Sequence, residues 1–155
     1  LSMPNTRFLE QLSTLLHSVR KELNMETAIV SYINGESYTL VMVDSEMKGV
    51  FEAGMVFPLD DTYCRDVYKL NQVMRYNHVG TMDNMSQHPV YLSVKLESYI
   101  AAPIHDTNGD VIGTVNFTSL FAQVDSFNED KVTLVTNLAD YIEQNINQYK
   151  SLVMK

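Results

Sequence analysis

The sequence predicts an α+β domain in which a central antiparallel β-sheet carries, on one face, helices from both ends of the chain. Two apolar, β-branched runs flank Asn34-Gly35, and two more flank Asn108-Gly109. An Asn-Gly pair between such runs is the strongest short-range signal of a β-hairpin, and hairpin strands pair antiparallel. Apolar residues also recur at three-and-four spacing near both termini, which is typical of amphipathic helices that pack on a shared sheet.

Length and composition narrow the class of protein. The 155 residues contain no linker or low-complexity tract, so we expect a single domain over residues 1–155. The net charge of −8 argues against nucleic acid or an anionic membrane as the main partner. No apolar run approaches the ~20 residues that span a bilayer, and no signal-peptide pattern opens the chain, so we expect a cytoplasmic protein. Because Leu1-Ser2 precedes Met3, we also expect the chain to be a piece of a longer protein.

The elements follow from local patterns. An apolar stripe predicts a helix over residues 4–24, and the sheet and its surroundings occupy residues 27–120. Within that region, Pro58 confines the extended segment around it to a sheet edge, and Asp61 or Thr62 is placed to cap a short helix that ends near Asn71. Further patterns predict a strand over residues 72–78, a helix opened by Pro89, and hairpin strands over 97–104 and 111–117 joined by a tight type I′ turn.

The last segment is unusual for its length. Ser126 and Glu129 form a capping-box pattern, and apolar residues recur from Val132 to the end of the chain. This predicts one long helix over residues 127–155, roughly twice the usual 11–12 residues of a helix in a globular protein. We therefore expect it to project beyond the core and to carry a signal.

Several segments, in this order and spacing, resemble those of a GAF domain: Pro58–Cys64, His88-Pro89, Glu97–Ile104, Ile112–Phe117 and Phe127–Asp130. GAF domains are sensory modules of bacterial signal-transduction proteins such as histidine kinases of two-component systems, diguanylate cyclases and phosphodiesterases. The resemblance implies a PAS-related fold with five or six antiparallel strands. It also implies terminal helices on one face, often in a parallel dimer bundle, and helices and loops that enclose a ligand pocket on the other.

The pocket would be enclosed by residues 60–70, by residues 80–96 and by one face of the second hairpin. A largely apolar set with a few polar groups is typical of ligand pockets, although each member alone could simply fill a core. Glu97, at the mouth of a strand, could orient a ligand, but capping of the local backbone is the favoured interpretation. The candidates are Tyr32, Met42, Phe57, Tyr63, Cys64, Val67, Tyr91, Glu97, Tyr99, Ala101, Thr114 and Asn116.

Cys64 raises the question of thiol chemistry. At the start of a short helix and beside Arg65 its pKa could be depressed, but no spacing identifies the base that nucleophilic catalysis requires, so a packed thiol is the favoured interpretation. Free methionine sulfoxide reductases of the GAF type use several cysteines, and one thiol cannot resolve its own sulfenic acid. Phytochrome-like relatives attach a bilin to a cysteine in the region where this chain has His88 and no cysteine, so no covalent bilin is expected there.

Other cofactors have little support. The histidines His17, His78, His88 and His105 are scattered without metal-ligand spacing, so no metal is expected, and neither haem nor flavin is indicated. The cofactor is therefore unknown.

The favoured hypothesis is a non-catalytic sensory domain. It would bind an unidentified small molecule over the sheet, form a homodimer through its terminal helices, and relay the signal to an effector domain in the same parent chain. One alternative is a ligand-free dimerisation module. Another is a redox or bilin-linked site at Cys64.

Overall fold

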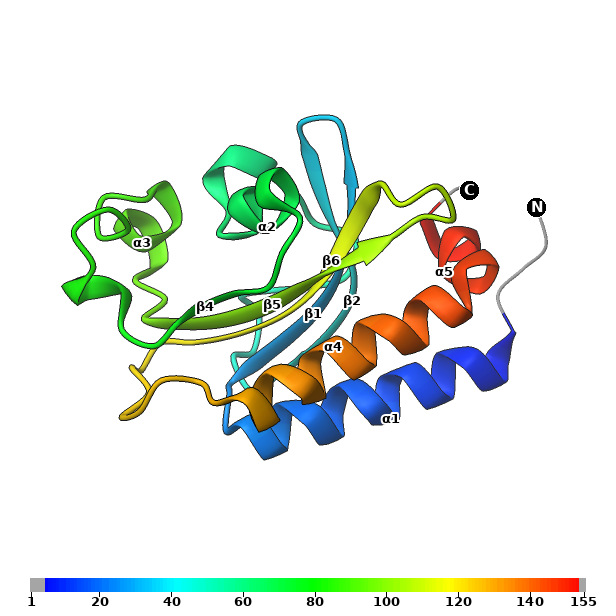
Figure 1. Ribbon diagram of the computed structural model, residues 1–155, viewed down its shortest axis with the longest axis horizontal. Helices are drawn as coiled ribbons and strands as arrows, with labels where there is room; N and C mark the ends of the chain where they lie inside the picture. Colours follow the sequence, from blue (N-terminus) through cyan, green and yellow to red (C-terminus); the bar gives the residue numbers. More distant parts are fainter. Residues whose placement is uncertain (1–4, 154–155) are drawn as a thin grey trace.

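The computed structural model describes residues 5–153 and confirms the α+β class. A six-stranded antiparallel sheet has the order β3-β2-β1-β6-β5-β4, with α1, α4 and α5 on one face and α2 and α3 on the other (Figure 1). The elements are α1 (Thr6–Leu23), β1 (Thr27–Asn34), β2 (Ser37–Ser45), β3 (Val56–Pro58), η1 (Leu59–Asp61), α2 (Cys64–Leu70), β4 (Met74–Tyr76), η2 (Val79–Thr81), α3 (Pro89–Val94), β5 (Ser98–His105), β6 (Val111–Ser119), α4 (Glu129–Gln144) and α5 (Ile146–Val153).

Both predicted hairpins are present, but their turns differ from the prediction. In the β1–β2 hairpin Asn34 pairs with Ser37, so Gly35 and Glu36 form the turn. In the β5–β6 hairpin the Gly109 N–H donates to the carbonyl of Asp106 at 2.9 Å, and among the turn residues only Gly109 has a positive φ. The type I′ turn predicted there is therefore wrong, because it would need positive φ at both central residues.

Side chains alternate along the strands between two cores. The helix-side core contains Phe8, Leu12 and Leu16 of α1 and Val135 and Ile142 of α4, together with one face of each central strand. The pocket-side core lies on the other face, beneath α2 and α3. Its buried members are Ile29, Ile33, Tyr38, Leu40, Leu59, Tyr63, Cys64, Val67, Tyr76, Val79, Met85, Leu96, Tyr99 and Ala101.

A β-bulge interrupts the alternation in β2. Val30 of β1 pairs with Met42 and Ser31 pairs with Leu40, so Val41 has no partner residue on β1. Such an extra residue places two consecutive side chains on one face of the sheet. Val41 and Met42 accordingly both pack against the helix-side core, whereas Leu40 and Val43 belong to the pocket side.

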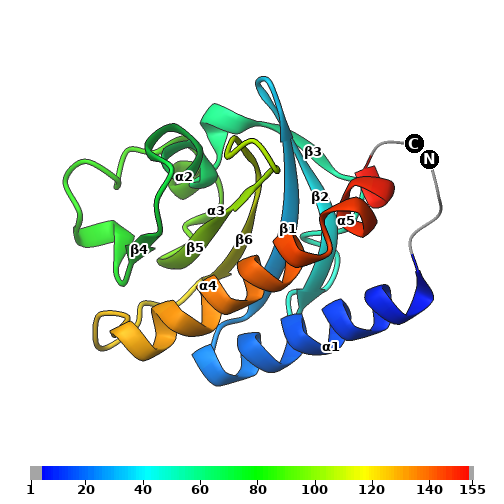
Figure 2. The same ribbon diagram turned by 45° about the vertical axis from the view of Figure 1, so that its right-hand side comes forward.

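The C-terminal segment is not one long helix. α4 ends at Gln144, the Asn145 N–H donates to the carbonyl of Ile142, and α5 begins at Ile146 in a new direction (Figure 2). Tyr149 of α5 is fully buried against the sheet, so this part of the expected projecting helix packs on the domain itself. The expected first residue of the N-terminal helix, Pro4, and the last residues 154–155 lie outside the described chain.

The caps also differ in detail from the sequence patterns. Asn128, not Ser126, caps α4, since its side chain accepts a hydrogen bond from the Lys131 N–H at 2.9 Å. α2 begins after Tyr63 without a side-chain cap, and the hydroxyl of Thr62 donates to the Leu59 carbonyl instead.

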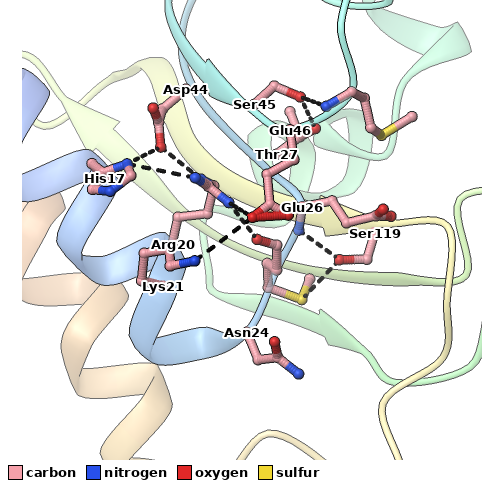
Figure 3. A network of polar contacts seen from close by, with 12 residues as sticks. His17, Arg20, Lys21, Asn24, Glu26, Thr27, Asp44, Ser45, Glu46 and Ser119 are labelled. Carbon is pink, nitrogen blue, oxygen red and sulfur yellow. Dashed lines mark hydrogen bonds and ion pairs between the residues drawn. The ribbon is translucent and has the colours of Figure 1, made fainter.

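Arg20 anchors the end of α1 to the sheet (Figure 3). Its buried guanidinium donates to the Asp44 carboxylate at 2.6 Å and to the Met25 carbonyl at 3.1 Å. Partial burial acts to raise the pKa of Asp44, but hydrogen bonds from Arg20 and His17 outweigh it and lower that pKa. None of the helices within residues 5–153 is both long and apolar enough to cross a lipid bilayer.

Candidate functional site: a cavity between the sheet and the short helices

A cavity of about 250 Å³ lies between the sheet and the two short helices α2 and α3. Its volume is near the lower end of the ~300–1,000 Å³ usual for ligand sites, so it suits a small molecule. Strands β1, β2, β5 and β6 form its floor and the short helices form its walls. The lining residues are Ile29, Tyr38, Leu40, Phe51, Phe57, Asp61, Thr62, Tyr63, Cys64, Pro89, Val90, Ser93, Val94, Leu96, Tyr99, Asn116 and Thr118.

The floor carries a connected polar cluster within an otherwise apolar site. The side-chain nitrogen of Asn116 donates to the Tyr38 hydroxyl at 2.9 Å and to the Thr114 hydroxyl at 3.1 Å. The Thr114 hydroxyl in turn lies 2.6 Å from the Ser31 hydroxyl. Hydrogen-bonded networks of this kind fix side-chain positions, because breaking one bond leaves a buried polar group without a partner.

Cys64 lies among these hydroxyl groups. Its sulfur is 3.0 Å from the Tyr99 hydroxyl, 3.2 Å from the Thr114 hydroxyl and 3.5 Å from the Tyr38 hydroxyl. Burial raises the pKa of the Cys64 thiol, although the hydrogen bonds with Thr114, Tyr99 and Tyr38 act to lower it. The thiol is therefore mostly protonated at neutral pH, and the position at the start of α2 does not activate it.

Aromatic rings pack behind one wall of the cavity. Tyr63 makes edge contacts with Tyr76, Tyr99 and His88, with ring centroids 5.8, 5.2 and 5.0 Å apart. The Tyr63 hydroxyl donates to the Leu96 carbonyl at 2.7 Å, which ties α2 to the chain just before β5. Burial and the nearby Asp66 carboxylate raise the pKa of Tyr76 to about 12. These contacts make the wall rigid and uncharged.

The structure brings part of the predicted set to the cavity. Phe57, Tyr63, Cys64, Tyr99 and Asn116 line it. Val67, Ala101 and Thr114 are buried just behind the lining, in the pocket-side core or the polar cluster. A role for any of these side chains in binding remains a prediction.

Glu97 and Tyr91 support the rim instead of lining the cavity. The Glu97 carboxylate accepts hydrogen bonds from the Gly80 N–H and from the Tyr91 hydroxyl, each at 2.9 Å. These bonds join η2, α3 and the start of β5. A Cβ at position 80 would collide with the Tyr91 hydroxyl, so a larger residue there would displace the Tyr91 side chain from this position.

Two predicted residues, Tyr32 and Met42, lie on the opposite face, against the helix-side core, and their expected place in the pocket is corrected. Regular alternation from Leu40 would bring Met42 to the pocket, but the bulge at Val41 turns it away. For Tyr32 the pattern was ambiguous, because both faces of β1 are buried and either set of alternating residues could face the pocket.

Sequence reasoning missed Tyr38, Leu40 and Thr118 among the lining residues. A signal for Thr118 was present, since Thr114, Asn116 and Thr118 alternate along one strand and must share a face. Tyr38 and Leu40 alternate in the same way along β2. The apolar residues of the loops and of α3 could not be assigned, because no periodic pattern fixes their direction.

The polar cluster also connects the cavity to α5 through the sheet. Gly113 faces the helix side, and the Tyr149 hydroxyl fits into the space that its missing side chain leaves. There the hydroxyl donates to the Ser31 carbonyl at 2.8 Å. Because the Ser31 side chain bonds to Thr114 on the other face, a short series of contacts runs from Asn116 at the cavity to Tyr149 in α5.

Within residues 5–153, His, Cys, Asp and Glu side chains do not gather in any group of three that could hold a metal ion.

Comparisons with known proteins agree with this architecture. Residues 6–147 match the family model described as GAF domain, which confirms the resemblance. No curated protein sequence matches the chain significantly.

Solved structures with low sequence identity share the fold. A free methionine-R-sulfoxide reductase from Neisseria meningitidis, in complex with its substrate, has a TM-score of 0.70 at 14% identity, over 96% of this chain and 83% of that chain. A phycocyanobilin-bound GAF domain from a cyanobacterial phytochrome has a TM-score of 0.69 at 15% identity, over 97% of each chain. The GAF domain of a two-component sensor histidine kinase from Bacillus halodurans has a TM-score of 0.63 at 17% identity, over 89% of this chain and 97% of that chain.

Proposed function

The chain belongs to the GAF domain family, and from this premise we propose that it is a non-catalytic sensory domain of a cytoplasmic signalling protein. It binds a small molecule in the cavity over the sheet and passes its binding state through α5 to an effector domain of the same parent chain. The observation that carries the proposal is the cavity, whose apolar walls and few fixed polar groups are typical of ligand sites.

Reduction of methionine sulfoxide by a thiol has weaker support, although methionine-R-sulfoxide reductase is the name of one structural neighbour. The sequence contains one cysteine, so an oxidised Cys64 would find no second thiol in the chain to form a disulfide. The same thiol is buried, its pKa is raised, and hydroxyl groups surround it instead of a base. The proposal therefore treats Cys64 as a packing residue of the cavity wall, which also argues against its use as a bilin attachment point.

The connection through the sheet supports the relay. Any ligand that contacts Asn116 bears on the Thr114 and Ser31 contacts, and the Ser31 carbonyl is held by Tyr149 of α5. Ligand binding can shift the balance between α5 packed on the sheet and α5 released from the sheet. It does so only if the two arrangements bind the ligand with different affinities. The Tyr149 hydroxyl is the contact that would carry this difference.

Binding is tested by blocking the cavity with a matched pair of variants on α3. Val94 lines the cavity, whereas Leu92 on the same helix is exposed and does not. A metabolite library is screened by thermal shift and by native mass spectrometry. We expect Val94→Trp to abolish the shift that a hit gives with the native protein, and Leu92→Trp to retain it. A hit that survives Val94→Trp binds elsewhere, and a library without any hit contradicts the proposed function.

The relay is tested by hydrogen–deuterium exchange with the hit from that screen. We expect the ligand to change the exchange of amides in α5 as well as in α2 and α3. Tyr149→Phe, which removes one hydroxyl and about 1 kcal/mol of stability, should uncouple α5 while leaving binding intact. Exchange that changes only in α2 and α3 of the native protein would contradict a relay through α5.

The homodimer expected from the sequence remains part of the proposal, with the outer faces of the terminal helices as its interface. Leu15 of α1 is 37% exposed there among mostly polar neighbours. A ligand-free dimerisation module would share this interface, but it would not account for the cavity.

A further inference from the structure

The floor of the cavity presents a hydrogen-bond acceptor that the protein does not use. Asn116 is 3% exposed, and its side-chain nitrogen donates to both Tyr38 and Thr114. No group within residues 5–153 donates to its side-chain oxygen. That oxygen is not sealed in the interior as the Tyr76 hydroxyl and His88 Nε2 are, so its remaining surface opens into the cavity that Asn116 lines.

The other polar groups of the floor are already engaged. The Thr118 hydroxyl donates to the Ser98 carbonyl at 2.9 Å, and the Tyr38 and Tyr99 hydroxyls contact the Cys64 sulfur. A buried acceptor that a ligand leaves unpaired is unfavourable, because it loses hydrogen bonds to water without gaining a replacement. A ligand that fills the floor must therefore offer a donor to the Asn116 oxygen.

Charge around the cavity disfavours anions. Apart from Cys64 and the tyrosines, Asp61 is the one ionisable residue among those that line the described cavity. No Lys, Arg or His side chain is among these lining residues. The two helices that begin at the cavity, α2 and α3, have seven and six residues, and the Val90 N–H of α3 is already bonded to His88. An anion entering the site would lose its hydration without a counter-charge.

From these contacts we infer that the ligand is a compact, largely apolar molecule, not anionic, that donates a hydrogen bond from N–H or O–H to the side-chain oxygen of Asn116. The inference rests on the proposed function, because it names the class of ligand for the same cavity. It excludes phosphorylated compounds and carboxylates as ligands that reach the floor.

Three bicyclic probes of similar shape test the requirement for a hydrogen-bond donor separately from the requirement that the ligand is not anionic. Indole carries an N–H donor, benzofuran replaces that N–H by oxygen, and indole-3-carboxylate adds a negative charge. Binding is measured by titrating the isotope-labelled protein and following the amide signals of β5 and β6 by NMR. We expect indole to bind about two- to thirteenfold more tightly than benzofuran, since a net hydrogen bond is worth about 0.5–1.5 kcal/mol. Indole-3-carboxylate should bind at least about tenfold more weakly than indole.

Two variants assign the preference to Asn116. Asn116→Leu keeps the side-chain size and removes the acceptor, so indole and benzofuran should bind it equally. Leu92→Ala changes an exposed residue of α3 that does not line the cavity, and it should keep the preference for indole. If Asn116→Leu does not fold, the probe comparison on the native protein still decides the question.

The outcomes are distinguishable from those of the proposed function. Equal binding of indole and benzofuran to the native protein would overturn the donor requirement, and tight binding of indole-3-carboxylate would overturn the charge requirement. Failure of all three probes would overturn the ligand class. The proposed function would survive that failure if the library gave a hit of another class that Val94→Trp blocks.

Discussion

At the scale of single residues, burial favours the uncharged form of His88, which packs against Tyr63 of the cavity wall. The imidazole is 4% exposed, and its Nδ1 accepts a hydrogen bond from the Val90 N–H at 3.2 Å, which caps α3. Burial, together with the nearby Arg65 guanidinium, lowers the pKa of His88. Protonation would remove the acceptor at Nδ1 and leave the first turn of α3 without its cap.

This predicts a dependence of stability on pH. Because the pKa of His88 is lower in the folded than in the unfolded protein, the unfolded chain takes up the proton first as the pH falls below about 6.5. Stability is therefore lost from that pH down to the folded-state pKa, by at most about 1.4 kcal/mol per pH unit. Urea unfolding of the native protein and of His88→Asn between pH 7.5 and 5 measures it.

Asparagine at position 88 retains a capping oxygen but does not titrate. As the pH falls below 6.5, the unfolding free energy of the native protein should therefore decrease more than that of His88→Asn. Parallel pH profiles for the two proteins would show that His88 does not contribute.

At the scale of elements, the bulge in β2 decides which side chains reach the cavity. With Val41 unpaired, Val30 still pairs with Met42 and Ser31 with Leu40, so removal of Val41 would leave a regular strand with every other residue on its present face. Removal of Val43 would instead turn Asp44 toward the pocket and away from Arg20.

Deletion of Val41 and deletion of Val43 form a matched pair, because each removes one half-buried valine. We expect the first variant to fold with a modest loss of stability. The second should lose about 3–5 kcal/mol more, since the buried Arg20 guanidinium would be left without its Asp44 partner. Urea unfolding checks both, and equal stability of the two variants would contradict the assignment of Val41 as the extra residue.

The helices and strands that follow from local periodicity could be predicted from the sequence. The points where a helix ends and the chain changes direction could not. The apolar stripes of α1 and α4 and the alternation in β5 and β6 can be read from the sequence because they depend on neighbours three, four or two residues away. The end of α4 at Gln144 depends on distant groups. The apolar repeat continues past Asn145, but burial of Tyr149 over Gly113 requires a change of direction that no local pattern encodes.

At the scale of the whole molecule, the sheet separates a helix-side core from the cavity, and the two sides differ in what the sequence could predict. The helix-side core is continuous and apolar, so its composition follows from amphipathic patterns. The cavity is assembled from β1, β2, β5, β6 and the segments between them, and its lining depends on the register between strands. This explains why Tyr99 and Asn116 were assigned to the cavity correctly, whereas Met42 was not and Tyr38 was missed.

The outer helical face gives the prediction for assembly. If α1 forms the dimer interface, Leu15→Lys should dissociate the dimer in analytical ultracentrifugation, because it places a charge in the contact. Leu92→Lys is the control, since Leu92 is 57% exposed on α3, on the opposite side of the sheet. A native protein that sediments as a monomer, or a dimer that Leu15→Lys leaves intact, would reject this interface.

The unpaired Val41 also affects how residues are matched between members of the family. A relative whose second strand lacks the extra residue aligns with this chain only if a one-residue gap is placed at position 41. An ungapped alignment would equate residues from opposite faces of the sheet throughout the remainder of β2. Ligand contacts transferred from such a relative would then be assigned to side chains, Met42 among them, that pack against the helices and cannot touch a ligand.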